Sequence, residues 1–233
     1  MNSFTFNGKS SAEFGLYISE KNIYSIPARD VNFHSVPGRS GDILIDNGRY
    51  ENVIVSYTVG LKNIKGNIRE IKAWLCKPGY LKLTDTYQPS LFRYACFCSS
   101  VDVVELLENV GTAQISFNCK PFMYLNSGQT TKTITGTGSV TLTNPCDFES
   151  EPLIRIYGSG AVTLTINDKS YNFTQVSPNL SCDSELMNCY YGTTLKNNVI
   201  NFTEFPVFEP GANVISYTGS VTRIIVTPRW RTL

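Results

Sequence analysis

The sequence is poor in histidine and has no long apolar run. His34 is the single histidine among 233 residues, so any Ser-His or Cys-His catalytic scheme would have to use it. It lies in an expected strand without a visible partner, and we expect it at the surface or in a turn. No window of about 18 apolar residues occurs, so we expect no membrane insertion.

Charge is also scarce and balanced. The formal net charge is +1, which gives no general attraction to nucleic acid, and we expect no recognition of a nucleic-acid sequence. Charged residues make up 17% of the chain, below the usual quarter or so, whereas aromatic residues reach 12%. Abundant Tyr, Phe, Thr, Val and Ile favour strands, so we expect a mainly β protein.

Seven cysteines are present, an odd number. The chain starts with neither a basic segment nor an apolar run, so we expect no secretory signal peptide. Cys96 and Cys98, the only close pair, have the wrong spacing for a zinc knuckle and share one face of a strand. We therefore expect reduced cysteines that act as small apolar residues in a protein made in a cytosol, with no metal and no cofactor.

The glycine-rich segment PGRSGD, residues 37–42, raises the question of a phosphate loop. The Gly-Lys-Ser/Thr ending of a P-loop is absent, so a turn between strands is the favoured interpretation. Downstream, Asn47-Gly48 separates two β-rich runs, which predicts a tight hairpin turn there. In the second run, Val53, Val55 and Tyr57 alternate and should share a face.

One segment, residues 63–76, has helical periodicity. Ile64, Ile68, Ile71 and Leu75 form one apolar stripe, with Asn63 as the N-cap. Strands are expected on both sides of it, and the last of these, at residues 113–119, should be broken by Lys120-Pro121-Phe122.

We expect two domains, residues 1–125 and 126–233. The second has short apolar runs separated by turn signals, which predicts a β-sandwich or jelly roll. One such turn is expected at Gly158-Ser159-Gly160. The expected strands are at residues 153–157, 162–166, 171–173, 202–208, 214–217 and 221–226.

No group of residues predicts catalysis. Asp147, Glu149 and Glu151 alternate, but in a proline-flanked edge segment they are expected to be solvated. Asp183 and Glu185 fall in an expected turn, where Asp favours local hydrogen bonds. We expect that the protein is not an enzyme.

Several short motifs, taken in order along the chain, resemble those of the siphophage distal tail protein family (Dit), from phages and prophages of Gram-positive bacteria. The motifs are FTFNG at 4–8, FGL at 14–16, VPGRSGD at 36–42, WL at 74–75, FNCKPF at 117–122, FP at 205–206, PGAN at 210–213 and PRWR at 228–231.

The resemblance implies a hexameric ring, or two stacked rings, that serves as a baseplate hub in the virion after assembly in the host cytoplasm. Residues 1–125 would form a ring domain, a β-sandwich or barrel-like fold with one helix. Residues 126–233 would form a galectin-like or carbohydrate-module-like sandwich. Implied partners are the tail tube protein, the tail-tip hub or tail-associated lysin protein, and the receptor-binding protein.

On this reading PGRSGD shapes a hairpin that contributes to the ring. The candidate interface residues are Pro37, Gly38, Arg39, Asp42 and Arg49, and the two arginines are expected to meet acidic residues of the next subunit. A surface hairpin without a contact role is the alternative.

Two other functions remain open. One is a cell-wall hydrolase, and the other is a free-standing carbohydrate-binding module using Tyr190, Tyr191 or Trp230. Sugar recognition needs a flat aromatic platform and polar groups on one open face. Most aromatic residues are expected in the core instead, as for Tyr157, Phe173 and Phe202. We therefore expect the second domain to dock tail-tip proteins and to bind no saccharide more tightly than millimolar.

Overall fold

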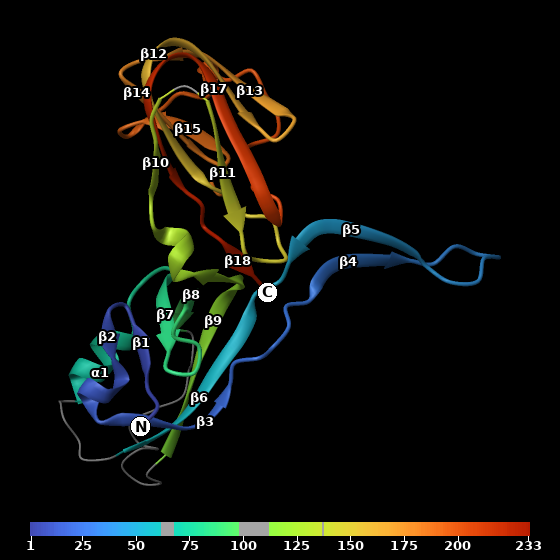
Figure 1. The fold of residues 1–233 in the computed structure, drawn as a ribbon. Coiled ribbons are helices and arrows are strands. Elements are labelled where there is room, and N and C mark those ends of the chain that lie inside the picture. The colour runs from blue at the N-terminus through green and yellow to red at the C-terminus, as the bar shows by residue number, and fades with distance from the viewer. Residues whose placement is uncertain (62–67, 98–111, 137) are drawn as a thin grey trace. The chain divides into compact units, whose positions relative to one another are not determined.

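A computed structural model describes residues 1–61, 68–97, 112–136 and 138–233 (Figure 1). The chain divides into two compact units, Met1–Met123 with Leu233, and Tyr124–Thr232. The boundary expected from the sequence lay after residue 125.

The first unit is built around one sheet with the strand order β2-β1-β7-β8-β9-β6-β3. A separate two-stranded sheet consists of β4 and β5. The elements are β1 (Phe4–Phe6), β2 (Lys9–Ser10), the 3-10 helix η1 (Ser11–Phe14), β3 (Leu16–Asn22), β4 (Arg29–His34), β5 (Ile43–Tyr50), β6 (Val53–Leu61), α1 (Ile68–Leu75), β7 (Leu81–Asp85), β8 (Leu91–Phe97) and β9 (Thr112–Leu125).

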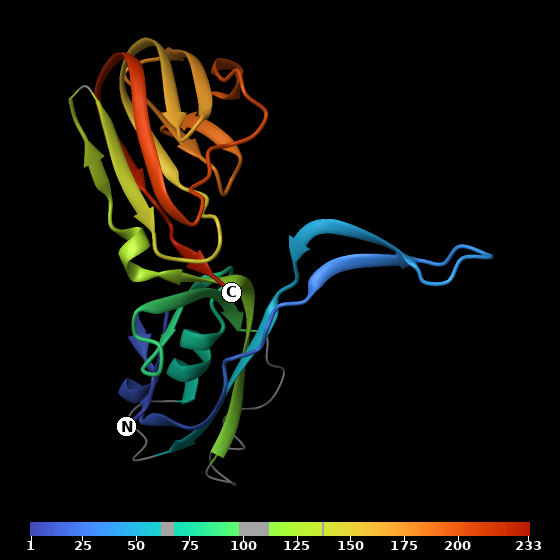
Figure 2. The ribbon, with the colours of Figure 1, turned by 45° about the vertical axis from the view of Figure 1, so that its right-hand side comes forward.

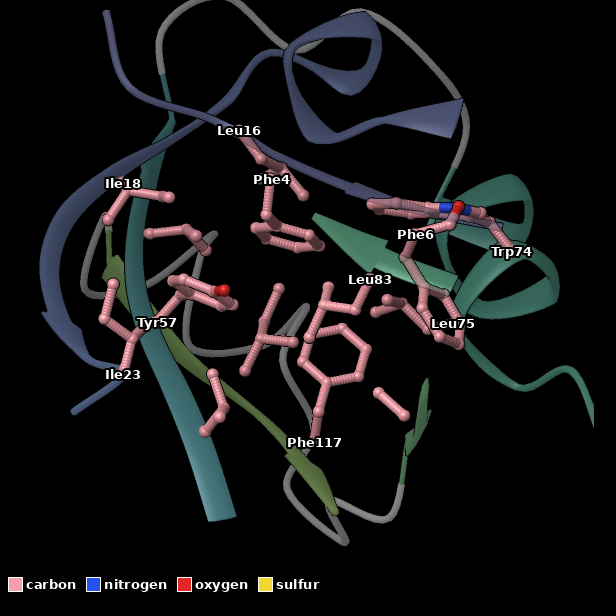
Figure 3. Close-up of a cluster of buried hydrophobic side chains, with 14 of the residues drawn as sticks. Phe4, Phe6, Leu16, Ile18, Ile23, Tyr57, Trp74, Leu75, Leu83 and Phe117 are labelled. Atoms are coloured by element: carbon pink, nitrogen blue, oxygen red, sulfur yellow. The ribbon is translucent and has the colours of Figure 1, made fainter. Parts of the chain in front are cut away.

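Aromatic side chains fill the core of this unit (Figure 3). Val55 and Tyr57 are buried on one face of β6, as their alternation predicts. Phe4 stacks on Tyr57 at 5.0 Å and on Trp74 at 5.6 Å between ring centroids. The Trp74 indole N–H also donates a 2.8 Å hydrogen bond to the carbonyl of Phe6. Strand β1 and helix α1 are thereby joined through one ring system.

Helix α1 confirms part of the predicted helix. Ile71 and Leu75 of the apolar stripe are buried, together with Trp74. The predicted N-cap Asn63 and Ile64 lie outside the described residues. A lysine-proline-glycine sequence follows the helix at residues 77–79, and Gly79 has a φ of 82°.

The second unit has the strand order β10-β17-β12-β14-β15-β16, with β11 added beside β17 and β13 beside β12. Its elements are the 3-10 helix η2 (Asn126–Gln129), β10 (Lys132–Ile134), β11 (Ser139–Asn144), β12 (Leu153–Ile166), β13 (Lys169–Val176), β14 (Asn179–Asp183), β15 (Asn188–Tyr191), β16 (Thr194–Leu195), the 3-10 helix η3 (Asn197–Val199), β17 (Gly211–Thr227) and β18 (Arg231–Thr232).

Strands β12 and β17 pair along nearly their whole length and carry bulges in the middle. A Cβ atom on Gly158 would lie 2.2 Å from the carbonyl oxygen of Ser220, so only glycine fits there. Both halves of β12, the long strand visible in Figure 2, supply one core. Ile156 from the first half and Leu164 from the second are examples. The predicted mainly β sandwich fold is confirmed, and the sheets in the described residues are open rather than closed barrels.

The structure corrects several local predictions. The turn expected at residues 158–160 is a bulge inside β12, and the two strands expected at 214–217 and 221–226 are one strand, β17. Strand β9 continues through Lys120-Pro121-Phe122 instead of ending there. Residues 202–208 form no regular strand, and Phe208 makes a single bridge to Ser150.

The hairpin turn predicted at Asn47-Gly48 is also wrong. Both residues lie inside β5, and the turn falls at residues 35–42, which include PGRSGD. The β4–β5 register shifts between Arg29 and Val31, so Asn47-Gly48 forms a bulge. Gly48 has a φ of 76°, which explains why a turn-like dipeptide occurs within a strand.

We predict that Trp74→Phe lowers the free energy of unfolding by roughly 1–3 kcal/mol, because it removes the donor that satisfies a buried carbonyl. Urea denaturation followed by circular dichroism measures this change. Ile54→Ala on the exposed face of β6 is the control and should change the value by less than about 0.5 kcal/mol. Equal stability of Trp74→Phe and the native protein would contradict the role given to Trp74.

Candidate assembly surface

Strands β4 and β5 form a ribbon, which we call the arm and define as residues 29–50 (Figures 1 and 2). Among the described residues, no third strand pairs with it. Phe33 and Leu44 lie directly opposite each other and are 66% and 56% exposed. Directly opposite residues share a face, so Ile43 and Ile45 lie on the other face, and they too are exposed. The arm therefore presents apolar side chains to solvent on both faces.

Charged residues set the shape of the arm around its bulge. Arg29 Nε lies 2.8 Å from Asp46 Oδ2, and Arg49 Nε lies 2.5 Å from Asp30 Oδ2. The Gly48 amide donates to Asp46 Oδ1 at 2.7 Å. The two ion pairs link β4 to β5 across the bulge, and the Gly48 contact holds the bulge within β5. Within this chain the Arg49 guanidinium is engaged by Asp30. The expected contact between Arg49 and an acidic residue of another subunit stays a prediction.

The turn of the arm holds the other candidate interface residues. Pro37, Gly38, Arg39 and Asp42 are all exposed. Gly38 and Gly41 have φ values of 81° and 83°, which accounts for the two glycines of PGRSGD. In the described part of the chain, the side chains of Arg39 and Asp42 make no hydrogen bond or ion pair. The structure thus places four of the five candidates together at the tip.

The structure does not bring the three aromatic candidates of the second unit together on one surface. Trp230 is buried and packs on Phe208 at 5.6 Å, so its ring is unavailable as a sugar platform. Tyr190 pairs with Ser181 of β14, and Tyr191 is the next residue of β15. The two tyrosines therefore point to opposite faces of β15, as expected for neighbours in a strand.

Tyr191 lines a shallow recess of about 100 Å³. Its floor is apolar, formed by Leu180 and Val199, and its other walls are polar. The polar walls are formed by Gln175, Ser177, Asn179 and Lys196. Among the described residues, no other side chain forms a hydrogen bond with the side chains of these four.

Tyr157 was expected in the core, but it lies on the outer face of the second unit. There the Arg223 guanidinium stacks over its ring at 4.3 Å from the centroid. The other two expectations are met, because Phe173 is buried and the partly buried Phe202 packs against the core.

Most of the acidic candidates are held in ion pairs. Asp183 is buried and receives two hydrogen bonds from Arg229, at 2.6 and 3.0 Å. Glu151 pairs with Arg231 at 2.7 Å. The predicted local hydrogen bond in the turn is present as well, from the Leu186 amide to Asp183 Oδ1. The sequence motif PRWR gave no sign that its arginines would reach these acids, which lie far away in the chain.

In the first unit, a carboxylate holds a buried phenol. The Tyr57 hydroxyl donates to Asp85 Oδ2 at 2.9 Å, and burial, followed by the nearby Asp85 charge, raises the pKa of Tyr57. Asp85 Oδ1 accepts the amides of Tyr87 and Gln88. This carboxylate therefore organises a turn and the core beneath it.

Within the described ranges, no three His, Cys, Asp or Glu side chains gather as they would around a metal ion. No helix in that part of the chain has the length and apolar character needed to cross a bilayer. His34 is exposed on the arm, in a strand as expected.

Comparisons with known proteins identify a fold. No family model and no curated protein matches the sequence. A crystal structure of the Dit protein of SPP1 matches over 100% of both chains, with a TM-score of 0.70 and 12% identity. The chain has the Dit fold. SPP1 Dit is described as a paradigm of the hub adsorption apparatus in phages that infect Gram-positive bacteria. The resemblance expected from the motif order is thus confirmed at the level of the fold.

We predict that the arm loosens in acid. Hydrogen bonds from Asn47 and Arg49 lower the pKa of Asp30, and the Gly48 amide and Arg29 lower that of Asp46, from ordinary values of 3.8. A lowered folded-state pKa contributes stability above the ordinary value, and that stability is lost as the pH falls through the folded value. Below pH 4, amide NMR signals of the arm should shift toward random-coil positions before those of the core sheet.

Asp46→Asn should loosen the arm at neutral pH. The matched control is Asp42→Asn at the tip, because the Asp42 side chain makes no hydrogen bond or ion pair within the described residues. An arm spectrum that stays unchanged down to pH 2 in the native protein would contradict the prediction.

Proposed function

We propose that this protein is a structural distal tail protein, the baseplate hub of a siphophage-type tail. In this role it forms a hexameric ring, single or stacked, and has no catalytic activity. It joins the tail tube to the tail-tip hub or tail-associated lysin protein and to the receptor-binding protein. Its place is the tail tip of the virion, after assembly in the host cytoplasm. The full-length match to SPP1 Dit supports the proposal.

The arm is the observation that carries the ring. Two strands alone are marginally stable in water, and this pair exposes apolar side chains on both faces. Burying one such side chain contributes roughly 1.5–3 kcal/mol. A surface on a second copy is the proposed cover. A contact between two different surfaces, repeated from chain to chain, gives a ring when the rotation between copies closes.

Within this proposal the candidate interface residues take different roles. Arg39 and Asp42 have opposite charges and lie at the tip, where they reach acidic and basic groups of the next copy. Pro37 and Gly38 shape the turn that carries them. Arg49 holds Asp30 within its own chain, so its removal weakens the arm itself as well as the predicted contact between copies.

We predict that the native protein has a solution mass about six times 26.0 kDa, or twelve times for stacked rings. The double variant Phe33→Ser/Leu44→Ser should be monomeric, because it removes roughly 3–6 kcal/mol of apolar burial per contact. Light scattering after size exclusion measures both masses.

The matched control is Val140→Ser/Val214→Ser, which changes two exposed valines on β11 and β17. It should keep the native mass. A native protein that stays monomeric at high concentration would rule out the ring, and an arm variant with the native mass would rule out the arm as its contact.

A second candidate function is a saccharide contact at the Tyr191 recess. The recess combines one aromatic ring with amide, hydroxyl and ammonium groups that have no side-chain partner among the described residues, on an apolar floor. Its volume of about 100 Å³ corresponds to about three water molecules, so a single sugar ring would rest on it rather than enter it. The contact is accordingly limited to affinities on the order of millimolar.

We predict saturation-transfer NMR signals from N-acetylglucosamine oligomers with the native protein, and their loss in Tyr191→Ala. Tyr190→Ala is the matched control, since Tyr190 points to the other face of β15, and it should retain the signals. Absence of signals from the native protein, or equal loss in both variants, would reject the recess as a sugar site and leave the hub proposal untouched.

A further inference from the structure

Two cysteines of the second unit face each other across a hairpin. Cys182 in β14 and Cys189 in β15 are directly opposite in the antiparallel register. Both are fully buried in the core of the unit. All six cysteines in the described residues are free thiols, as expected from the sequence. The sequence gave no reason to single out this pair, because six residues separate the two cysteines.

The backbone places the pair at the closer of the two kinds of antiparallel site. The Cys189 amide donates to Asn197 Oδ1, and its carbonyl accepts from the Lys196 amide, both at 2.7 Å. Both groups therefore point away from β14, and Cys182 and Cys189 form a non-hydrogen-bonded pair. Such pairs have Cα atoms about 4.5 Å apart, with side chains closer than at the alternate site. That spacing lies within the range that a disulfide spans, toward its short end.

The thiols are also in contact. A hydrogen bond with Cys189, followed by burial, raises the pKa of Cys182. Cys182 is therefore held in its protonated form at neutral pH and reacts slowly, because the thiolate is the nucleophile in disulfide chemistry. A reducing cytosol would leave both thiols intact.

We propose that Cys182 and Cys189 are a redox pair that closes into a cross-strand disulfide when the protein meets a disulfide oxidant such as oxidised glutathione. The thiolate of one cysteine attacks a sulfur of oxidised glutathione and releases one glutathione thiolate. The second cysteine thiolate then attacks the protein sulfur of this mixed disulfide and releases the other. The two protons from the cysteines end on the two glutathiones. Two thiols and one oxidised glutathione thus give one protein disulfide and two reduced glutathiones.

The position of the pair in the sheet controls the rate. Both sulfurs are inaccessible in the closed hairpin, so the first attack requires local opening. On the side of β15 away from β14, the strand order in the described residues ends with β16, a strand of two residues. Short edge elements open at lower free energy than the centre of a sheet. Oxidation is therefore gated by the opening of this edge, and conditions that favour opening should accelerate it.

The bond would fix a segment with exposed side chains. The turn between the two cysteines carries Leu186 and Met187, which are both exposed, and Tyr190 and Tyr191 follow directly. A link between β14 and β15 restrains all four positions. The inference goes beyond the hub function and does not depend on it, since it rests on the register and burial of the two cysteines alone.

Trypsin makes the test direct, because residues 170–196 form one peptide between Lys169 and Lys196 that contains both cysteines and no other. The full-length protein is incubated with oxidised glutathione, and the remaining thiols are alkylated. The protein is then digested with trypsin, and the mass of the peptide is measured by mass spectrometry. With time, a growing fraction of this peptide should have two hydrogens fewer than the reduced peptide and carry no alkyl group. This fraction should form faster in mild urea. Dithiothreitol should return it to the doubly alkylated mass.

Cys182→Ala and Cys189→Ala should each leave the remaining cysteine as an alkylated thiol or a glutathione adduct, without an internal bond. Cys146→Ala, a change in the same core that leaves the pair intact, should oxidise like the native protein. Oxidised native protein should melt at a higher temperature than reduced protein, and the two single variants should lack this difference. A native peptide with two alkylatable thiols after prolonged oxidation in mild urea would overturn the proposal, and this readout does not depend on whether any variant folds.

Discussion

A two-stranded ribbon has no interior, and this constraint leaves apolar side chains of the arm exposed to solvent. The apolar side chains of the middle of the arm are exposed to solvent on one face of the ribbon or the other, whereas Val31 and Tyr50 are half-buried. Alternation along a strand normally directs apolar residues to one face and polar residues to the other. Here Phe33 with Leu44, and Ile43 with Ile45, place apolar groups on both faces. Neither face can be covered by the other, so stable burial must come from outside the ribbon.

Outside the arm, each unit buries its apolar side chains in a core of its own. In the first unit, Trp74 joins helix α1 to strand β1 through stacking and through its hydrogen bond to Phe6. In the second, the long strands β12 and β17 bring both of their halves to one core. Each unit therefore has its own core, and the arm is free to act as an attachment. Its internal ion pairs, Arg29 with Asp46 and Arg49 with Asp30, maintain its shape without burying its apolar residues.

The sequence predicts what depends on local periodicity. The buried face of β6 follows from the alternation of Val53, Val55 and Tyr57, and the buried Ile71 and Leu75 follow from helical spacing. It fails where tertiary pairing overrides a local signal. Asn47-Gly48 is a strong hairpin dipeptide, yet β4 pairs with β5 on both sides of it and turns it into a bulge. Gly158 signals a turn in the same way, but β17 keeps β12 continuous through it.

The candidate site shows the same limit. The tip residues Arg39 and Asp42 were found from the sequence because a glycine-rich turn is a local feature. The apolar residues Phe33 and Leu44 were missed, since their exposure depends on the absence of a third strand, which no local pattern records. Arg229 and Asp183 were not recognised as partners because 46 positions separate them. That Cys182 and Cys189 lie directly opposite each other likewise follows only from the register of the hairpin.

The central claim is that the arm is covered by another copy of the chain. Hydrogen exchange of the arm amides, measured across a dilution series that crosses the assembly transition, tests it most directly. The account predicts that residues 29–50 become protected in step with the appearance of the oligomer, while the core amides of β6 and β12 stay equally protected throughout. Arm amides that exchange at one rate in monomer and oligomer alike would contradict it.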